Sequence, residues 1–129
     1  GMGFRAQTGS GHMVNMDTAA EGGGHNLAPR PTELVLAGAG GCSAVDVVLI
    51  LKKGREDVRG CEVLLQAERA DTEPKVFTRI NFHFVVTGKN LKHAAVERAI
   101  KLSHEKYCSV SIMLGKTAEI TSSFEVLEG

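Results

Sequence analysis

One apolar segment, residues 31–53, constrains the fold more than any other part of the sequence. The run Pro31-Thr32-Glu33 is expected to open a helix here, with Thr32 as the N-cap residue and Glu33 favourably placed in the first turn. Gly54 is well suited to end this helix. Leucine, valine and isoleucine occur on all its sides, so no polar face remains to meet water. We therefore expect a central helix that is covered by a sheet or by a second subunit.

The remaining patterns predict strands, helices and one long loop around this helix. Phe4–Thr8 and His12–Met16 flank a glycine-containing turn and are expected to form a hairpin. Residues 17–31 are small, polar and glycine-rich, which is typical of a mobile surface loop. The other expected elements are strands at 61–70, 76–87 and 117–126, a helix at 91–106 and a helical turn at 109–114.

Composition excludes several classes of partner. The chain has 129 residues, the size of a single domain spanning 1–129, and its 15 basic and 15 acidic residues balance. That balance gives no electrostatic attraction to nucleic acid or to an anionic membrane. Glycines and Asp46 interrupt the apolar stretch, so no membrane span is expected. No signal peptide is expected at the start, where Gly1 ahead of Met2 is interpreted as an expression scar. Three cysteines, odd in number and few for the length, favour a reducing cytoplasm over a secreted disulfide scaffold.

Two cysteines, Cys42 and Cys108, lie in separate short apolar motifs, Ala37–Val45 and Lys106–Ser111. They are too far apart in sequence for a C-x-x-C loop or a zinc knuckle, so a shared site would have to be assembled by the fold. Glycines precede Cys42, although each glycine costs about 1 kcal/mol inside a helix. These glycines fit the close approach of a second helix or space for a substrate beside the sulfur. The alternative is a seam of small packed residues in which Cys42 is a small hydrophobe.

The neighbouring acid and the other cysteines have alternatives of their own. A helix that starts at Ser109 would favour a thiolate at Cys108, whereas the alternative is a buried structural cysteine. Cys61 begins an alternating strand and is interpreted as a packing residue. Asp46 lies one helical turn after Cys42 on the same face, where its negative charge would oppose a thiolate. We therefore expect Asp46 to hydrogen-bond backbone or a partner subunit, or to reach a basic group.

No pattern points to a metal or a cofactor. The five histidines form no metal-ligand spacing with a cysteine or a carboxylate. His93 and His104, on the predicted helix at 91–106, are interpreted as solvated side chains. The glycine-rich stretches lack the strand–turn–helix context of a phosphate-binding loop. The sequence therefore predicts a protein without a bound cofactor and without a metal.

The segment Pro31–Ala44 is similar to the first cysteine motif of the OsmC/Ohr family, the osmotically inducible and organic hydroperoxide resistance proteins. Lys106–Ser111 resembles the second cysteine motif of that family, and Val85–Gly88 also fits. The likeness extends from about Gly9 to Val126 and is greatest to the YhfA-like branch. This resemblance implies an α+β fold with antiparallel sheets wrapped around a long buried central helix. It also implies an intertwined homodimer with two active sites at the subunit interface.

The same resemblance implies thiol peroxidase chemistry in oxidative stress defence. Cys42 would be the peroxidatic thiolate, which attacks the O–O bond of a small organic hydroperoxide and becomes a sulfenic acid. Cys108 would condense with it to a Cys42–Cys108 disulfide, and an external dithiol reductant would restore both thiols. The family's peroxidases place a glutamate directly after the motif proline, where it pairs with an arginine that activates the first cysteine. Thr32 holds that position here, so the candidate supporting polar residues are Arg30, Thr32, Glu33 and Asp46.

Two other hypotheses are compatible with the sequence. In one, the protein is a non-catalytic homodimer that responds to redox state or binds an apolar ligand in the same pocket. In the other, all three cysteines are structural, and Cys42 reacts at the slow rate of a buried thiol.

Overall fold

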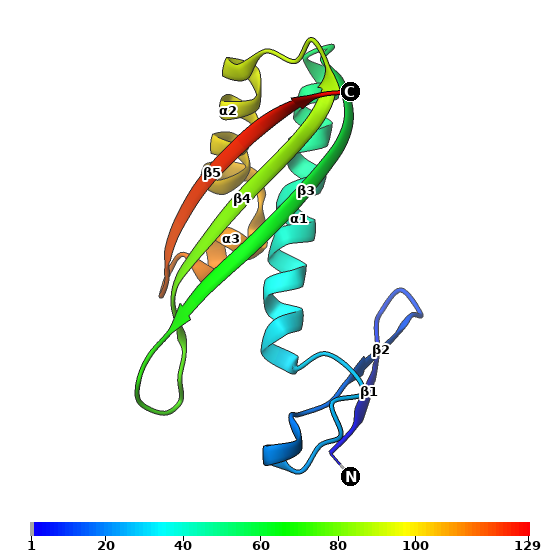
Figure 1. Cartoon of the computed structure of the whole chain (residues 1–129), viewed down its shortest axis with the longest axis vertical. Coiled ribbons are helices and arrows are strands. Elements are labelled where there is room, and N and C mark those ends of the chain that lie inside the picture. Colours follow the sequence, from blue (N-terminus) through cyan, green and yellow to red (C-terminus); the bar gives the residue numbers. More distant parts are fainter. Residues whose placement is uncertain (1) are drawn as a thin grey trace. The chain divides into compact units, whose positions relative to one another are not determined.

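The computed structural model describes residues 2–129, and Gly1, interpreted above as an expression scar, lies outside them. The described chain forms two compact units that are divided between Ala37 and Gly38. Helix α1, Pro31–Lys53, contributes residues to both units (Figure 1). The helix predicted over residues 31–53 is therefore confirmed.

The start of α1 differs from the prediction in its capping residue. Pro31 occupies the first helical position, where a missing N–H costs nothing. Arg30 is the N-cap residue: its carbonyl oxygen accepts the Leu34 N–H at 3.2 Å, and its own N–H donates to Glu33 Oε1 at 2.8 Å. The second of these bonds is half of a capping box. The prediction of Thr32 as N-cap is wrong, because Thr32 already lies inside the first turn.

The first unit begins with a two-stranded hairpin. Strand β1, Phe4–Gln7, pairs antiparallel with β2, Met13–Met16, which confirms the predicted hairpin. The turn between them contains Gly11 at φ 88°, a left-handed conformation that glycine adopts without strain. A short 3-10 helix, η1, follows at Ala20–Gly22.

One buried aspartate gathers the loop after the hairpin. The Asp17 carboxylate accepts the backbone N–H groups of Thr18, His25 and Leu27 at 2.8, 3.1 and 3.2 Å. These bonds, that from Leu27 foremost, lower the pKa of Asp17 because they stabilise the carboxylate. The loop at 17–31 is therefore hydrogen-bonded to a fixed centre, and its mobility stays a prediction.

The second unit is built on a three-stranded sheet with the order β3-β4-β5. Strands β3, Asp57–Arg69, and β4, Phe77–Lys89, are antiparallel neighbours. Strand β5, Glu119–Glu128, runs parallel to β4. A parallel pair needs a crossover connection. The connection here consists of helix α2, His93–Leu102, the π-turn η2, Ser103–Tyr107, and helix α3, Ser109–Leu114. The antiparallel arrangement that was expected therefore holds for β3 and β4, whereas the pairing of β5 with β4 is parallel.

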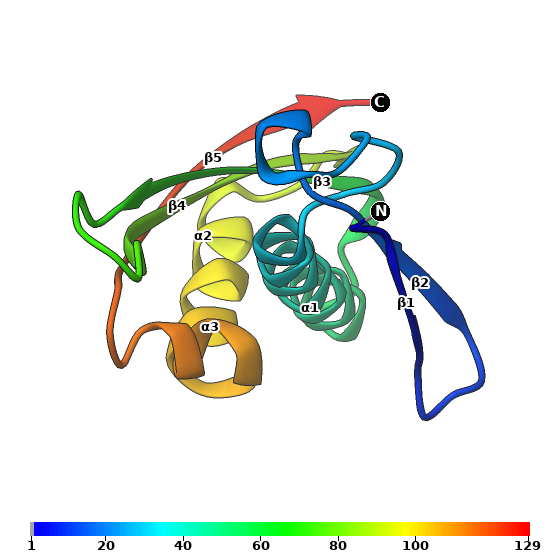
Figure 2. The same cartoon turned by 90° about the horizontal axis from the view of Figure 1, so that it is seen from below.

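Helices α2 and α3 and the 38–53 part of α1 lie on one face of this sheet (Figures 1 and 2). Alternate side chains of β4 point into the space beneath them and are completely buried: Ile80, Phe82, Phe84 and Val86. Val47 and Leu51 of α1 and Val96 and Ala99 of α2 pack into the same core. The alternation that predicted a strand at 76–87 is thus the buried face of the central strand.

Two element boundaries differ from the predictions for identifiable reasons. Strand β3 begins at Asp57 and not at Cys61 as predicted. Its pairing with β4 shifts between Val58 and Gly60, and this irregularity hides the alternation of the first residues of the strand. The helix expected at 91–106 ends its regular part at Leu102 and continues as the π-turn η2. The helical turn predicted at 109–114 is confirmed as α3.

Within one chain, α1 is buried along a single stripe and not on most sides as expected. The buried residues are Ala39, Gly40, Ser43, Val47 and Leu51. Val45 and Leu49, on another side, are 58% and 53% exposed. By length and composition α1 could cross a membrane, with a mean hydropathy of 2.2 over its best window. That is weak evidence, because the core helices of soluble proteins meet the same criterion. The sheet therefore covers only the buried stripe of α1, and the other sides of the helix are not covered by it.

Candidate thiol site

The fold brings Cys42 and Cys108 together. Cys42 lies on α1, and Cys108 immediately precedes α3. Their Sγ atoms and one carboxylate oxygen of Asp46 all lie within 4.8 Å of one another. Cys108 is completely buried, Cys42 is half-buried, and both are free thiols. One site therefore contains both cysteines and an acid that the sequence placed beside Cys42 alone.

The π-turn sets the position of Cys108. The Cys108 N–H donates to the carbonyl oxygen of Ser103, five residues earlier, at 2.7 Å. Such a turn carries one residue more than an α-helical turn and is frequent at functional sites. The backbone leaves helical geometry at Cys108, with φ −81° and ψ 99°. The side chain then caps α3, because Sγ accepts the Ser111 N–H at 3.4 Å.

Two buried serines hold Asp46. Ser103 Oγ donates to Asp46 Oδ2 at 3.1 Å, and Ser43 Oγ lies 2.9 Å from Ser103 Oγ. Since each hydroxyl carries one proton, Ser43 is the donor to Ser103. The contacts predicted for Asp46 were backbone, a partner subunit or a basic group, so the serine was missed. Sequence reasoning had no signal for it, because Ser103 and Asp46 belong to different elements and no local spacing relates them.

Burial decides the protonation of Cys108. Removal from water raises the pKa of this thiol, because burial disfavours the charged thiolate. The hydrogen bonds of Ser111 act in the opposite direction, and the nearby Cys42 adds to the rise because two thiolates would repel. Burial therefore outweighs the helix start at Ser109, which was expected to favour a thiolate at Cys108. The Cys108 thiol therefore keeps its proton at neutral pH.

His104 is not the solvated residue that the sequence predicted. Its ring packs edge-on against Phe82, with centroids 4.5 Å apart, and lies 5.7 Å from Phe84. Among the described residues its buried Nε2 has no hydrogen-bond partner. Burial lowers the pKa of His104, and the charge of Asp46 acts in the opposite direction. His93, in contrast, is exposed, as predicted.

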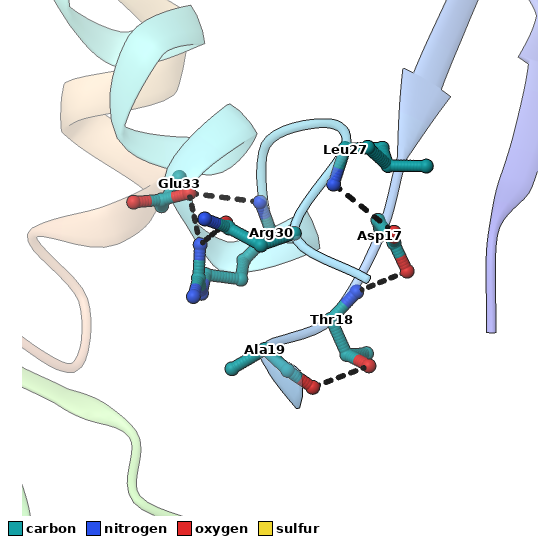
Figure 3. Close-up of polar contacts among 7 residues, drawn as sticks. Asp17, Thr18, Ala19, Leu27, Arg30 and Glu33 are labelled. Atoms are coloured by element: carbon teal, nitrogen blue, oxygen red, sulfur yellow. Dashed lines mark hydrogen bonds and ion pairs between the residues drawn. The ribbon is translucent and has the colours of Figure 1, made fainter. Parts of the chain in front are cut away.

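In the first unit, Arg30 and Glu33 contact each other. Arg30 Nη1 lies 3.9 Å from Glu33 Oε1 and donates to Asn26 Oδ1 at 2.9 Å (Figure 3). Thr32 is half-buried in the first turn of α1. Among the predicted supporting residues, Asp46 lies beside the cysteines in the second unit. Any contribution of Arg30, Thr32 or Glu33 to the site stays a prediction.

An open groove of 530 Å³ in the second unit reaches Asp46. Apolar side chains form much of its wall, and two basic residues border it: Leu49, Ile50, Leu102 and Tyr107, with Lys53 and Arg98. Pockets for small molecules are mostly apolar and have volumes of about 300–1,000 Å³. The groove is therefore large enough for a small organic ligand, and Asp46 connects it with the thiol site.

Comparison with known proteins shows the family of the chain. The family model described as OsmC-like protein matches residues 23–123, most of the chain. The chain belongs to the OsmC-like family. Within this family, it is 54% identical over 127 residues to protein YhfA of Escherichia coli K12, covering 98% of this chain and 92% of that protein. The predicted OsmC-like family and the predicted likeness to its YhfA-like branch are thereby confirmed.

Solved structures of other proteins share the fold. A hypothetical protein from Aquifex aeolicus VF5 is 33% identical, with a TM-score of 0.85 over 98% of this chain and 89% of that one. An organic hydroperoxide resistance protein OsmC from Legionella pneumophila is 16% identical, with a TM-score of 0.66 over 96% and 95% of the two chains. At that identity the Legionella structure supports the fold alone. The predicted α+β, OsmC-like fold is confirmed.

Proposed function

We propose that this OsmC-like protein is a thiol-dependent peroxide reductase that reduces organic hydroperoxides in oxidative stress defence. The observation that carries the proposal is the approach of the Cys42 and Cys108 Sγ atoms to within 4.8 Å. A disulfide bond is about 2.05 Å long, so the two sulfur atoms have to approach by less than about 3 Å to form one. A distant structural relative is named an organic hydroperoxide resistance protein, which agrees with this chemistry.

Cys42 is the peroxidatic residue in this proposal, because it is half-buried whereas Cys108 is completely buried. The Cys42 thiolate attacks one peroxide oxygen, the O–O bond breaks, and the departing alkoxide takes up a proton to leave as an alcohol. The peroxide gains two electrons, and Cys42 is oxidised to a sulfenic acid. The apolar groove beside Asp46 suits the organic part of such a substrate.

Cys108 is the resolving residue, and Asp46 handles its proton. The buried Cys108 thiol has to lose this proton as its sulfur attacks the sulfenic sulfur of Cys42. The Asp46 carboxylate, within 4.8 Å of both sulfurs, accepts the proton and passes it to the departing hydroxide, which leaves as water. Ser103 keeps the carboxylate in position. An external dithiol then reduces the Cys42–Cys108 disulfide and is itself oxidised to a disulfide.

The working form in this proposal is a single-domain, intertwined homodimer in the reducing cytoplasm. Val45 and Leu49 leave an apolar side of α1 uncovered within one chain. A Cβ added at Gly38 or Gly41 would meet no atom within 4 Å, which leaves room for another backbone to approach closely. The candidate residues of the first unit that could support the Cys42 thiolate are Arg30, Thr32 and Glu33.

A single-turnover reaction of the reduced protein with cumene hydroperoxide tests the proposed function. The wild-type chain should consume one peroxide and lose two free thiols. Cys42→Ser should consume no peroxide, because the attacking thiolate is gone, and Cys61→Ser should react like wild type. Peroxide consumption by Cys42→Ser at the wild-type rate would refute the proposal.

Asp46→Asn separates the two chemical steps within that reaction. This variant should form the sulfenic acid at the wild-type rate but resolve it slowly, so that dimedone traps more of it. Resolution should recover at alkaline pH, where the Cys108 thiol ionises without a base. Equal resolution rates in Asp46→Asn and wild type would remove Asp46 from the mechanism and leave the roles of Cys42 and Cys108 intact.

The groove supports a second candidate function, binding of an apolar ligand by a redox-responsive, non-catalytic dimer. Its apolar walls provide for such a ligand without any reaction at sulfur. This alternative predicts negligible peroxide turnover in wild type and unchanged ligand retention in Cys42→Ser. Rapid wild-type turnover that is lost in Cys42→Ser would decide for the peroxidase.

A further inference from the structure

We propose that the reduced site is also a binding site for a thiophilic divalent cation, of which Zn²⁺ is the physiological example, with Cys42, Cys108 and Asp46 as its protein ligands. The three ligand atoms lie within 4.8 Å of one another and come from one chain. Thiolate and carboxylate are both ligands that Zn²⁺ takes in proteins. This inference goes beyond peroxide reduction and does not depend on it.

The spacing of the three atoms suits a tetrahedral ion. Zn–S and Zn–O bonds of about 2.3 and 2.1 Å place two tetrahedral sulfur ligands about 3.8 Å apart and a sulfur and an oxygen about 3.6 Å apart. The observed separations of up to 4.8 Å therefore need only a small inward movement of the side chains. Cys42 and Asp46 are one turn apart on α1, so one helix face supplies two ligands, and Cys108 supplies the third. A fourth position stays open for water or a small ligand.

The charges of the site favour a cation. Two thiolates and a carboxylate carry negative charges that repel one another at these separations. A bound dication offsets this repulsion because it stabilises all three anionic groups, and the thiols release their protons to solvent when they bind the ion.

Contacts outside the cluster already orient two of the three ligands. Ser103 donates to Asp46 Oδ2 at 3.1 Å, and the Ser111 N–H donates to Cys108 Sγ at 3.4 Å. Partners of this kind commonly fix metal ligands and change metal affinity by about 10–100-fold when they are lost. A carboxylate oxygen has a second lone pair, so the bond from Ser103 leaves Asp46 able to bind a metal.

The test is a titration of reduced, metal-free protein with Zn²⁺ in competition with a chromophoric chelator. Wild type should bind one Zn²⁺ per chain. Cys42→Ser and Cys108→Ser should each weaken binding by more than about 100-fold, and Asp46→Asn by about 10-fold or more. The matched control is Cys61→Ser, which should bind like wild type because Cys61 lies on β3 outside the cluster. Absence of binding by wild type, or wild-type affinity in both Cys42→Ser and Cys108→Ser, would overturn the proposal.

A second measurement needs no variant and so does not depend on how a variant folds. Zn²⁺ should slow the alkylation of Cys42 and Cys108 in native wild-type protein at least tenfold, as read residue by residue by mass spectrometry. Cys61 should be alkylated at the same rate with and without the ion. Equal rates at Cys42 and Cys108 in both conditions would refute the site. Peroxide is absent from both experiments, so their failure would leave the proposed reductase untouched.

Discussion

Two ionisable side chains of the second unit, Cys108 and His104, have pKa values that are shifted by burial. Burial raises the pKa of Cys108 and lowers that of His104, so both side chains are held uncharged. The physical cause is the same, because surroundings poor in water disfavour the charged form, which is a thiolate in one case and an imidazolium in the other. Phe82 and Phe84 surround the His104 ring and offer a protonated Nε2 no hydrogen-bond acceptor.

The lowered pKa of His104 predicts a loss of stability in mild acid. The folded-state pKa lies below the ordinary value of 6.5, so between the two values the unfolded chain binds a proton that the folded chain does not. The free energy of unfolding should therefore fall as the pH drops below 6.5 and level off once folded His104 is also protonated. We expect a loss of at most about 1 kcal/mol between pH 7.5 and 5.5, since the ring is partly screened by solvent.

Urea unfolding of wild type and of His104→Gln at these two pH values measures this effect. His104→Gln should lose that part of the pH dependence, whereas His93→Gln, at an exposed position of α2, should keep it. Asp46 faces His104, so the comparison is repeated in the Asp46→Asn background to separate its contribution. An unchanged pH dependence in His104→Gln would show that another group is responsible.

At the scale of elements, some features follow from local pattern and others from contacts. The buried face of β4 and the extent of α1 could be predicted, because periodicity and helix-ending residues are written in adjacent residues. The N-cap of α1 was misassigned, since Pro31 accounts for the helix start better than a hydroxyl does. The π-turn η2 could not be predicted, because its sequence is ordinary for a helix. In addition, the side chain of its first residue, Ser103, is held by hydrogen bonds with Ser43 and Asp46 of α1, which no local pattern reveals.

The serine contact between α1 and η2 predicts a measurable loss of stability on its removal. Ser103→Ala would leave the buried Ser43 hydroxyl and the Asp46 carboxylate without their partner. Buried polar groups left unpaired cost about 1–3 kcal/mol each, so the free energy of unfolding should fall by at least about 1 kcal/mol. Urea unfolding measures this change, with Ser122→Ala, at an exposed position of β5, as the matched control. A Ser103→Ala protein as stable as the control would show that the contact adds nothing.

At the scale of the whole molecule, direction of pairing and assembly of the site escape local reasoning. The alternation within β5 does not distinguish a strand that runs parallel to β4 from one that runs antiparallel, because side chains alternate in both. The cysteine pair was predicted through family resemblance, and Asp46 through its helical spacing from Cys42. Ser43 and Ser103 were not predicted, because their partnership exists only after α1 and η2 have packed on the sheet.

The uncovered side of α1 predicts self-association through that side. Leu49→Glu should place a charge in the proposed dimer contact and shift the protein toward monomer. The matched control is Leu64→Glu on β3, because Leu64 and Leu49 are 51% and 53% exposed in one chain. Sedimentation velocity should show at least a tenfold weaker dimer for Leu49→Glu and no change for Leu64→Glu. A monomeric wild type, or equal effects of both substitutions, would contradict a dimer formed through α1.

The extra residue in η2 has a consequence for how the sulfur–sulfur approach is encoded. Consecutive residues of an α-helix differ by about 100° in direction. Removing one residue from η2 would therefore restore α-helical geometry and rotate the residues that follow by roughly that angle about the helix axis. Cys108 would then face elsewhere, although each remaining amino acid would be unchanged. Chain length between Ser103 and Cys108 is therefore as much a part of the reactive centre as the two thiols themselves.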